Sequence, residues 1–530
     1  MTFLTEILLM TCACMMASRY YAHMFQLESY QIDGYFRWLR KRPERLTGAT
    51  LYFAAGAMAL KMLLFLLLRL ASIERAEFFA SVLVSLLLIA AWYRQMQKLR
   101  GESDKKPLVV TARVKRLAVS LALVNLAVCA LLGLLGAVSI MPLALGLVPI
   151  TAALAAYIAQ PMEKAINRHY FMDARSRLAA REDIIKIGIT GSYGKTSVKF
   201  ILGTILSEQY NVLVPPSSYN TPMGLTRLIR DHLAPEHQVF IAEMGARHEG
   251  DIRELCQLVA PRYGIITSVG PQHLETFGTV ERVMRTKNEL IEALPEQGVA
   301  FFNADDAWVD KMYAMCAIEK QRVGIAKGTR SLWPEEIESG PEGSRFVLCN
   351  LDGNRAPMTT RLLGVHNISN IVLACAVARR LGMDIETIAR GVAKVTPVEH
   401  RLQLIRNPGG YIVIDDSFNA NPHGAKAALN VLATFQGKKF FVTPGIVEAG
   451  AREAELNRAL GEQMAGVVDV AILVGAKRAA ALREGLDAKG FDPGCVFVVE
   501  RPAEASAIYG RMARPGDVIL FENDLPDTYN

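Results

Sequence analysis

The sequence has no CxxC pair, and its eight cysteines are scattered along 530 residues. This scatter excludes a disulfide framework and a zinc site built from paired cysteines, and it fits a reducing compartment. We therefore expect the thiols to be packing residues. They stand at positions 12, 14, 129, 256, 316, 349, 375 and 495, and the first three lie within apolar runs.

Internal repeats and low-complexity tracts are also missing from the sequence. With 51% hydrophobic and 21% charged residues, the composition excludes a disordered or fibrous chain. A length of 530 residues exceeds one compact domain and indicates about three or four.

Acidic residues are scarce in the first third of the chain. Residues 1–180 carry 21 Lys and Arg against 10 Asp and Glu, whereas the other 350 residues carry 38 against 42. The mean hydropathy of +0.20 is high for a soluble enzyme, and the apolar excess lies in the same basic third. Because a nucleic-acid binder carries its positive charge on its folded domains, this division argues against nucleic acid as a partner.

Five segments of the first third approach the roughly 20 apolar residues that cross a bilayer as a helix. We therefore expect residues 1–160 to form a membrane module of about five transmembrane helices. The first segment is interpreted as an anchor, because it lacks the basic start and the cleavage site of a signal peptide. The segments are 3–18, 49–71, 78–93, 117–138 and 140–159.

The distribution of basic loops predicts the orientation of this module. Loops 19–48 and 94–116 are rich in Lys and Arg, while the opposite connections are not, so both long loops are expected in the cytoplasm. Everything after residue 160 is then cytoplasmic, beginning with a linker helix over 161–180. This predicts a multi-pass protein of the inner or plasma membrane with its globular part in the cytoplasm.

Two charged residues fall within the second expected span. Arg69 is near its end and is expected to reach the interface. Lys61 lies deeper and is either a functional group or a lysine that faces a neighbouring helix. Residues 20–42 mix aromatic and basic side chains, which fits either an interfacial amphipathic helix or a packed linker helix.

After residue 180, short β-branched runs alternate with helix-length segments, which indicates βαβ units and mainly parallel sheets. A break near 397–406 divides this part into two α/β domains, 181–400 and 401–530. Residues 326–362 are expected to be irregular or β-rich, as an insertion. The expected strands are 184–190, 238–244, 263–269, 298–303, 411–416, 439–443, 469–475, 495–499 and 516–522.

The strongest motif is TGSYGKTS at 190–197, which follows an expected strand and opens an apolar-periodic helix over 195–208. Glycines allow backbone N–H groups to approach phosphate oxygens, and the helix N-terminus adds its positive end. Lys195 can reach the β- and γ-phosphates, and the Thr196 hydroxyl can bind Mg²⁺. Ile189 replaces the first glycine of the usual GxxxxGKT pattern, so the prediction depends on the strand–loop–helix context. The predicted phosphate-binding residues are Gly191, Ser192, Tyr193, Gly194, Lys195, Thr196 and Ser197.

Three further polar residues follow expected strands or lie just beyond them. Glu243 closes a strand, His273 follows another, and Lys287 lies in the next helical stretch. Strand carboxyl ends are where an α/β sheet binds ligands, so each is a candidate site residue. Each also has a structural alternative, respectively a helix cap, a loop hydrogen bond and a solvated lysine.

The motifs together resemble the Mur ligase family, the ATP-dependent enzymes that form amide bonds in peptidoglycan precursor synthesis. The resemblance covers about residues 181–530 and is nearest to the MurF type, which adds D-alanyl-D-alanine. In chain order the motifs are TGSYGKTS, EMGARHEGDI, SVGPQHLETFG, the lysine of RTKNELI with NADD, GVHNISN, VEHRL and DDSFNANP.

The resemblance implies two Mg²⁺ sites. Thr196 matches the contact to the first ion, with Glu243 completing that site, while Lys195 matches a phosphate contact. His273 matches a ligand of the second ion. Lys287 matches the lysine that is carbamylated in the family and helps to hold that ion.

The resemblance also implies the remaining nucleotide contacts. Asn370 is similar to an adenine-contacting asparagine, Arg401 to an arginine that approaches the phosphates, and Asp416 to an aspartate near the ribose. The implied catalytic residues are Lys195, Lys287, His273 and Arg401.

The implied reaction uses ATP to convert a carboxylate into an acyl phosphate, which an amine then attacks. The partners would be a small-molecule or lipid-linked cell-wall precursor and an amino acid or dipeptide, at a bilayer. The sequence departs from the family pattern at two places, so the identity of the acceptor is not predicted. The membrane module replaces the usual UDP-binding domain, and TPGIVEAG at 443–450 differs from the family's usual sequence there. The alternatives are the same chemistry on a lipid-linked or polyglutamate-type capsule substrate, or an ATP-driven transporter or sensor.

Overall fold

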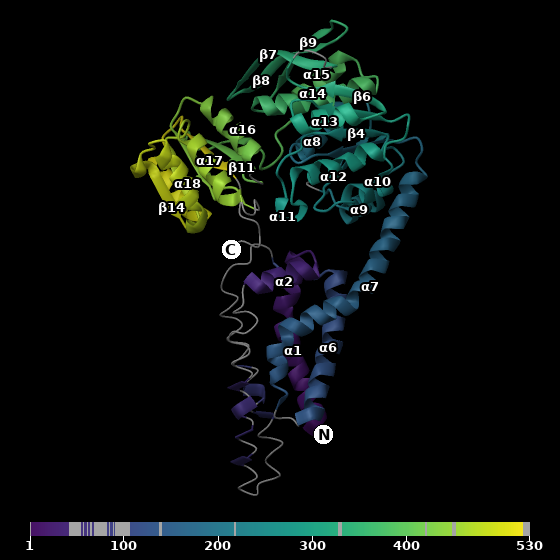
Figure 1. The fold of residues 1–530 in the computed structure, drawn as a ribbon, viewed down its shortest axis with the longest axis vertical. Coiled ribbons are helices and arrows are strands. Elements are labelled where there is room, and N and C mark those ends of the chain that lie inside the picture. The colour runs from purple at the N-terminus through teal and green to yellow at the C-terminus, as the bar shows by residue number, and fades with distance from the viewer. Residues whose placement is uncertain are drawn as a thin grey trace. The chain divides into compact units, whose positions relative to one another are not determined.

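The computed structural model describes residues 2–41, 107–136, 140–216, 219–326, 331–418, 421–447 and 452–522, with short pieces between 55 and 90. The chain forms two compact units, one up to Arg168 and one from His169 onward (Figure 1).

The described part of the first unit is helical. Its long helices are α1 (Thr2–Leu27), α2 (Ile32–Lys41), α6 (Ala112–Gly136) and α7 (Leu143–Ala179). Three of them, α1, α6 and α7, cover most of the expected spans 3–18, 117–138 and 140–159. The spans 49–71 and 78–93 lie largely outside the described residues, as do Lys61 and Arg69.

Two described helices, α6 over 112–135 and α7, are long and apolar enough to cross a membrane by length and composition. Such a pair is weak evidence, because core helices of soluble proteins pass the same test, and 56% of the apolar window of α7 is buried. Membrane insertion therefore stays a prediction. Both helices also expose large apolar side chains, among them Leu123, Leu131, Leu134, Leu135, Ile150 and Leu154.

Of the segment expected over 20–42, residues 20–27 end α1 and residues 32–41 form α2, which packs inside the unit. The Tyr35 ring of α2 is fully buried and stacks on Phe25 with the ring centroids 4.1 Å apart. Its hydroxyl donates a 2.8 Å hydrogen bond to the Pro149 carbonyl in α7. These contacts agree with the packed-helix alternative for this segment.

The linker helix expected over 161–180 is not separate from the last expected span. One helix, α7, runs through both, with Pro161 in its interior. Proline removes a single backbone donor there, and the helix continues on either side of it. In the second unit, Ala174 and Leu178 of this helix are buried in the core.

The second unit contains a nine-stranded sheet in the order β2-β3-β1-β4-β5-β6-β7-β8-β9. The six strands β1 to β6 run parallel, so their carboxyl ends meet at one edge. They are β1 (Ile185–Thr190), β2 (Val212–Leu213), β3 (Val239–Glu243), β4 (Tyr263–Ile266), β5 (Val299–Asn303) and β6 (Glu319–Val323).

In the segment expected over 326–362, the described residues 331–362 are β-rich and extend this sheet. Its strands are β7 (Leu332–Gly340), β8 (Gly343–Asn350) and β9 (Arg355–Thr360). β7 pairs in parallel with β6, while β7, β8 and β9 are antiparallel to one another.

Helices cover both faces of the nine-stranded sheet, each burying an apolar side. One face packs against α8 (Lys195–Leu206), α14 (Val365–Arg380) and α15 (Ile385–Lys394). The other packs against the end of α7 and against α9 (Pro222–His232), α10 (Asp251–Val259), α11 (Leu274–Phe277), α12 (Val280–Glu292) and α13 (Ala307–Met315). Figure 1 shows these layers around the strands.

A six-stranded sheet follows, in the order β10-β11-β15-β12-β13-β14, parallel except for β10. Its strands are β10 (Gln403–Arg406), β11 (Ile412–Asp416), β12 (Lys439–Thr443), β13 (Val470–Val474), β14 (Val496–Val499) and β15 (Val518–Glu522). One face packs against α16 (Pro422–Ala433), α17 (Glu453–Met464) and α18 (Ala476–Ala488), and the other against α19 (Pro502–Met512), with a short η3 (Pro493–Cys495) before β14.

The two α/β sheets confirm the fold class expected for the chain after residue 180. All nine strands expected from the sequence are present, with ends that differ by up to three residues.

Candidate active site

The loop after β1 requires its glycines. Gly191 has φ +154°, and a Cβ added to it would lie 2.1 Å from the Thr267 hydroxyl oxygen. Gly194 has φ +81°, and its Cβ would lie 3.0 Å from Oδ1 of Asn370. The backbone therefore passes close to the residues after β4 and to α14, and only glycine fits at 191.

Hydrogen bonds fix this loop to the segment after β4. The Ser192 N–H donates to the Ser268 carbonyl at 2.8 Å, and the Tyr193 N–H donates to the Ser268 hydroxyl at 2.7 Å. The Gly270 N–H donates to the Ser192 hydroxyl at 3.0 Å. The first N–H groups of α8, which begins at Lys195, have no intrahelical acceptors and are the donors left for an anion.

The Lys195 side chain bends back so that its amine lies against the loop backbone. Its Nζ donates to the Gly191 carbonyl at 2.7 Å and to the Ser192 carbonyl at 3.0 Å. Burial lowers the pKa of Lys195 to about 8, an effect that Glu243 opposes and Arg401 reinforces. The loop thus has a cation where a phosphate group would enter.

Glu243, at the end of β3, is buried beside the same loop. Its Oε1 accepts from the Thr196 hydroxyl at 3.0 Å and from Nδ2 of Asn220 at 3.2 Å. The Lys199 amine lies 3.2 Å from its Oε2 as a fully buried ion pair. Three side chains therefore hold one carboxylate next to the phosphate loop.

The Thr196–Glu243 pair fits a magnesium ion chemically, because Mg²⁺ prefers oxygen ligands and is usually held by one or two protein groups plus phosphate oxygens. A metal ion bound at Oε2 of Glu243 would share that oxygen with the Lys199 ammonium, which lies 3.2 Å away. Across the described ranges, no group of three His, Cys, Asp or Glu residues converges on a metal position. The predicted set contains only two such residues, Glu243 and His273, so this finding does not test it.

Lys287, on α12, is 3% exposed. Burial and the nearby Lys195 ammonium lower the pKa of Lys287 to about 7, while Asp251 and Glu289 oppose the shift. No ion pair with Lys287 is found among the described residues. The structure thus brings two predicted site lysines within electrostatic range of each other and leaves Lys287 neutral about half of the time near pH 7.

His273 directly precedes α11, and its backbone has a left-handed conformation with φ +53°. It is three residues beyond Gly270, whose N–H is bonded to the phosphate loop. Three residues span at most about 11 Å, so the His273 backbone lies close to that loop.

Arg401 comes from the start of the second α/β domain. Its guanidinium lies 4.3 Å from the Phe418 ring centroid, and its buried Nε makes no hydrogen bond within the described structure. Burial lowers the pKa of Arg401, and the charges of Glu243 and Asp416 oppose that shift. Arg401 therefore lies within electrostatic range of the phosphate loop from the other domain.

Asp416 ends β11 and accepts a 3.2 Å hydrogen bond from the Leu402 N–H. Burial raises the pKa of Asp416 to about 7, while the Arg401 charge and the Leu402 hydrogen bond lower it.

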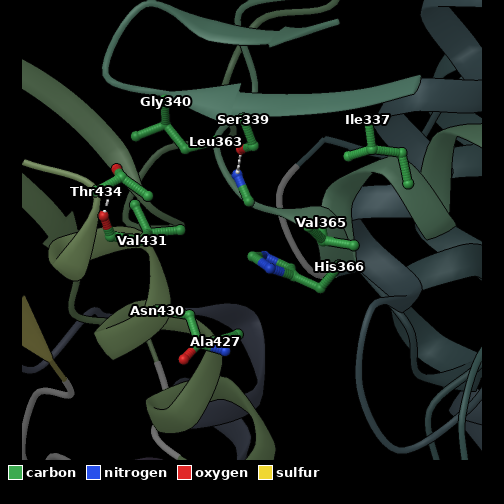
Figure 2. Close-up of a pocket in the computed structure, with 11 residues that line it drawn as sticks. Ile337, Ser339, Gly340, Leu363, Val365, His366, Ala427, Asn430, Val431 and Thr434 are labelled. Atoms are coloured by element: carbon green, nitrogen blue, oxygen red, sulfur yellow. Dashed lines mark hydrogen bonds between the residues drawn. The ribbon is translucent and has the colours of Figure 1, made fainter. Parts of the chain in front are cut away.

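Asn370 and His366 lie one helical turn apart on α14, and His366 lines a cavity of about 370 Å³. Figure 2 shows the imidazole pointing into the space between α14 and α16. Burial lowers the pKa of His366 to about 4, so the ring is neutral at pH 7 and offers one donor and one acceptor. The other lining residues are Ile337, Ser339, Gly340, Leu363, Gly364, Val365, Ala427, Asn430, Val431 and Thr434.

Several residues that support this site were not predicted from the sequence. Lys199 could have been found, because it lies one turn beyond Lys195 on the same helix. Asn220 carries no recognisable signal, and neither does the contact of Tyr193 with His423, whose ring centroids are 5.9 Å apart. Ser197, which was predicted, lies in the first turn of α8 and is partly exposed.

Two family models match the second unit. Residues 189–378 match the Mur ligase middle domain, and residues 400–522 match the model described as Mur ligase, glutamate ligase domain. The two matches span most of both sheets.

Curated relatives share the name UDP-N-acetylmuramoyl-tripeptide–D-alanyl-D-alanine ligase. The protein from Mycobacterium bovis is 35% identical over 249 residues, which are 47% of this chain and 48% of the relative. The protein from Mycobacterium leprae is 31% identical over 366 residues, 63% of this chain and 70% of the relative. The chain thus spans about half the length of the first of these relatives.

Solved structures give a similar result. MurF from Acinetobacter baumannii has a TM-score of 0.61 at 27% identity, covering 68% of this chain and 78% of that one. The MurF ligase from Thermotoga maritima in complex with ADP has a TM-score of 0.61 at 25% identity, covering 68% and 81%.

Proposed function

Because this chain belongs to the Mur ligase family, we propose that it is an ATP-dependent ligase that forms an amide bond on a peptidoglycan precursor. The amine is D-alanyl-D-alanine or a similar compound, as the names of the relatives suggest. The observation that carries the proposal is the convergence of Lys195, Thr196, Glu243, Lys287 and Arg401 around one glycine loop.

In this proposal the ATP phosphates lie on the loop 191–197. The first N–H groups of α8 and the Lys195 ammonium bind the β- and γ-phosphates. Arg401 adds a second cation from the other domain, and its unpartnered Nε supports a role toward an anion.

Thr196 and Glu243 hold one Mg²⁺, while His273 and the carbamate of Lys287 hold a second. When bound, the two ions neutralise charge on the transferring phosphoryl group and on the acyl oxygen. The lowered pKa of Lys287 supports the carbamate, because only a neutral amine attacks CO₂, and the product loses one proton.

The base of the nucleotide lies along α14, where Asn370 is beside Gly194 of the loop and His366 lines the adjoining cavity. That volume lies within the range of small-molecule pockets, roughly 300–1,000 Å³. Asp416 is proposed to lie near the ribose.

The reaction begins when the acceptor carboxylate attacks the γ-phosphorus, ADP leaves, and an acyl phosphate forms. The amine then attacks the carbonyl carbon, inorganic phosphate leaves, and the nitrogen loses a proton. Because water would hydrolyse the acyl phosphate, the second α/β domain closes over the site, carrying Arg401 and Asp416.

For the first unit we propose a multi-pass anchor in the inner or plasma membrane, with the ligase domains in the cytoplasm. The apolar side chains exposed on α6 and α7 and the basic loops of the sequence support this location. The acceptor is then UDP-linked and held at the membrane-proximal helices, or lipid-linked and reached at the bilayer surface. A polyglutamate-type substrate is the alternative within the same chemistry, and a transporter or sensor has less support because it requires neither His273 nor Lys287.

The central test uses the variants Lys195→Ala and Lys287→Ala in the full-length protein. Each is expected to abolish amide formation while the protein stays folded, because one loses a phosphate contact and the other a metal ligand. Added bicarbonate is expected to increase wild-type activity more than that of Lys287→Ala. Product is measured by mass spectrometry and folding by circular dichroism.

The matched control is Lys311→Ala, which removes an exposed lysine from the neighbouring helix α13. It should behave as wild type. Full activity in Lys287→Ala would contradict the carbamate assignment.

The acceptor is identified by incubating detergent-solubilised protein with ATP, D-alanyl-D-alanine and either UDP-linked or lipid-linked precursors. The acceptor that gains the mass of the dipeptide less water is the substrate. If no acceptor gains mass while a transported solute stimulates ATP hydrolysis, the ligase proposal fails.

Membrane attachment is tested by fractionation of cells that express the protein. We expect the full chain to sediment with membranes and to stay there after extraction with alkaline carbonate, because only detergent releases helices that span a bilayer. Release by carbonate alone would contradict the anchor.

A further inference from the structure

Arg401 lies in a strained turn. Its two neighbours, His400 and Leu402, both have positive φ values, +60° and +47°. Residues other than glycine rarely adopt this region, and they stay in it only where the surrounding structure holds them. Positive φ values on both sides of one half-buried arginine require an explanation.

Hydrogen bonds from the end of β11 hold both neighbours. Nδ1 of His400 lies 2.7 Å from Oδ2 of Asp415, and the Leu402 N–H donates to Oδ1 of Asp416 at 3.2 Å. The Phe418 N–H also donates to the His400 carbonyl at 3.3 Å. Both residues next to Arg401 are therefore hydrogen-bonded to residues at the end of β11 or just after it.

The Asp415 carboxylate is itself held in place. Its Oδ1 accepts from the Ser417 hydroxyl at 2.6 Å and from the Ser417 N–H at 3.1 Å. Asp415 also pairs with Gln403 in the antiparallel register of β10 and β11. Asp415 is therefore a rigid acceptor opposite the turn.

The contact contributes little to overall stability, because the His400 side chain is 48% exposed and solvent screens the interaction. Its main effect is local, on the backbone that carries the Arg401 side chain. That side chain packs over Phe418 and interacts with the charges of Glu243 and Asp416.

We propose that His400 and Asp415 are positioning residues, which hold the strained turn so that the Arg401 guanidinium faces the nucleotide phosphates. The inference rests on the proposed function, since it requires a nucleotide in the site. His400 does not touch the nucleotide and acts only through Arg401.

The experiment measures the affinity of the full-length protein in detergent for the non-hydrolysable ATP analogue AMPPCP by calorimetry. Arg401→Ala is expected to weaken binding about tenfold or more, and His400→Ala or Asp415→Ala about fivefold. His400→Asn should bind within about twofold of wild type, because the amide donor of asparagine occupies the place of Nδ1 and asparagine tolerates positive φ.

A double variant separates positioning from a purely structural role. In the Arg401→Ala background, adding His400→Ala should change the affinity by less than about twofold, because the positioned group is already absent. The matched control is Arg406→Ala, which breaks the exposed 2.9 Å ion pair of the same strand β10 with Glu342. That variant should bind as wild type.

Unchanged affinity in His400→Ala, with Arg401→Ala impaired, would overturn the inference. An equal loss from His400→Ala in both backgrounds would also overturn it, because His400 would then act independently of Arg401. If the wild type does not bind AMPPCP at all, the proposed function itself fails, which is a different result. Thermal melting of each variant verifies that the protein measured is folded.

Discussion

Beside the phosphate loop, three cationic side chains share one carboxylate. Lys195, Lys199 and Arg401 all interact with the single carboxylate of Glu243, and Lys287 interacts with Lys195. Buried charges of one sign raise the free energy of one another, and a polyanion relieves this. The residues are therefore arranged for a ligand that carries several negative charges.

Glu522 gives a prediction about pH. Burial raises the pKa of Glu522 to about 8, although the Thr443 hydroxyl donates to it at 2.7 Å. Below about pH 4.5 the carboxyl is protonated in the folded and unfolded chain, and its full contribution to stability is present. As the pH rises toward 8 only the unfolded chain ionises, so stability falls by at most about 1.4 kcal/mol per pH unit.

Melting temperatures at pH 5, 6, 7 and 8 test this prediction. Glu522→Gln should show a smaller decrease than wild type over this interval, because its amide does not ionise. The control Glu500→Gln changes an exposed residue just after β14, a strand of the same sheet, and should follow the wild-type curve. Parallel curves for wild type and Glu522→Gln would contradict the prediction.

At the residue level, the side chains that could be predicted from the sequence are those that belong to a local motif. The glycines and Lys195 belong to one contiguous stretch, so their proximity follows from their order. The Lys199–Glu243 pair joins a helix to a different strand, and no local pattern indicates which strand faces that helix. The contact of His400 with Asp415 was missed for the same reason.

At the level of secondary structure, α10 depends on another helix for its N-terminal cap. Its N-cap residue is Gly250, which has no side chain to accept the free N–H groups. Glu289 of α12 accepts instead from the N–H groups of Gly250 at 2.7 Å and Arg253 at 2.9 Å. A carboxylate at a helix N-terminus is also favoured by the helix dipole.

Glu289→Ala is therefore expected to lower the free energy of unfolding by about 1–3 kcal/mol, because two N–H groups lose their acceptor. Glu289→Gln should lose less, since it keeps one acceptor oxygen. Denaturant unfolding measures the difference. Glu292→Ala, an exposed change on the same helix, is the control, and an equal loss from it would contradict the capping role.

Strand prediction succeeded where strands are buried on both faces. β13 is buried throughout, and its apolar run VAILV predicts a central parallel strand. β6, with the sequence EKQRV, is mostly half-exposed and carries no such run. Its place in the sheet comes from pairing with β5 and β7, which tertiary structure decides.

For the whole molecule, the proposed nucleotide contacts come from both α/β domains. A ligand at 100 times its dissociation constant stabilises a protein by about 2.7 kcal/mol. AMPPCP with Mg²⁺ should therefore raise the apparent melting temperature of the wild type, whereas Lys195→Ala should show little change. Lys311→Ala should respond as wild type, and an equal rise in Lys195→Ala would contradict the nucleotide site.

The two α/β domains were predictable because their motifs and strands recur in a recognisable order. The first unit was less predictable. The sequence placed apolar helices at α1, α6 and α7, but it divided α7 at Pro161, where the helix continues. Composition alone does not distinguish a helix that lipid covers from one that protein covers.

The distribution of the thiols has a practical consequence. Six of the eight cysteines are buried, Cys12 on α1 is exposed, and Cys495 is partly exposed. Each unit therefore already carries one accessible attachment point for a maleimide dye. In sealed vesicles, a reagent that cannot permeate would report at Cys495 which side the ligase domains face, and the shielding of Cys12 would map lipid contact on unmodified protein.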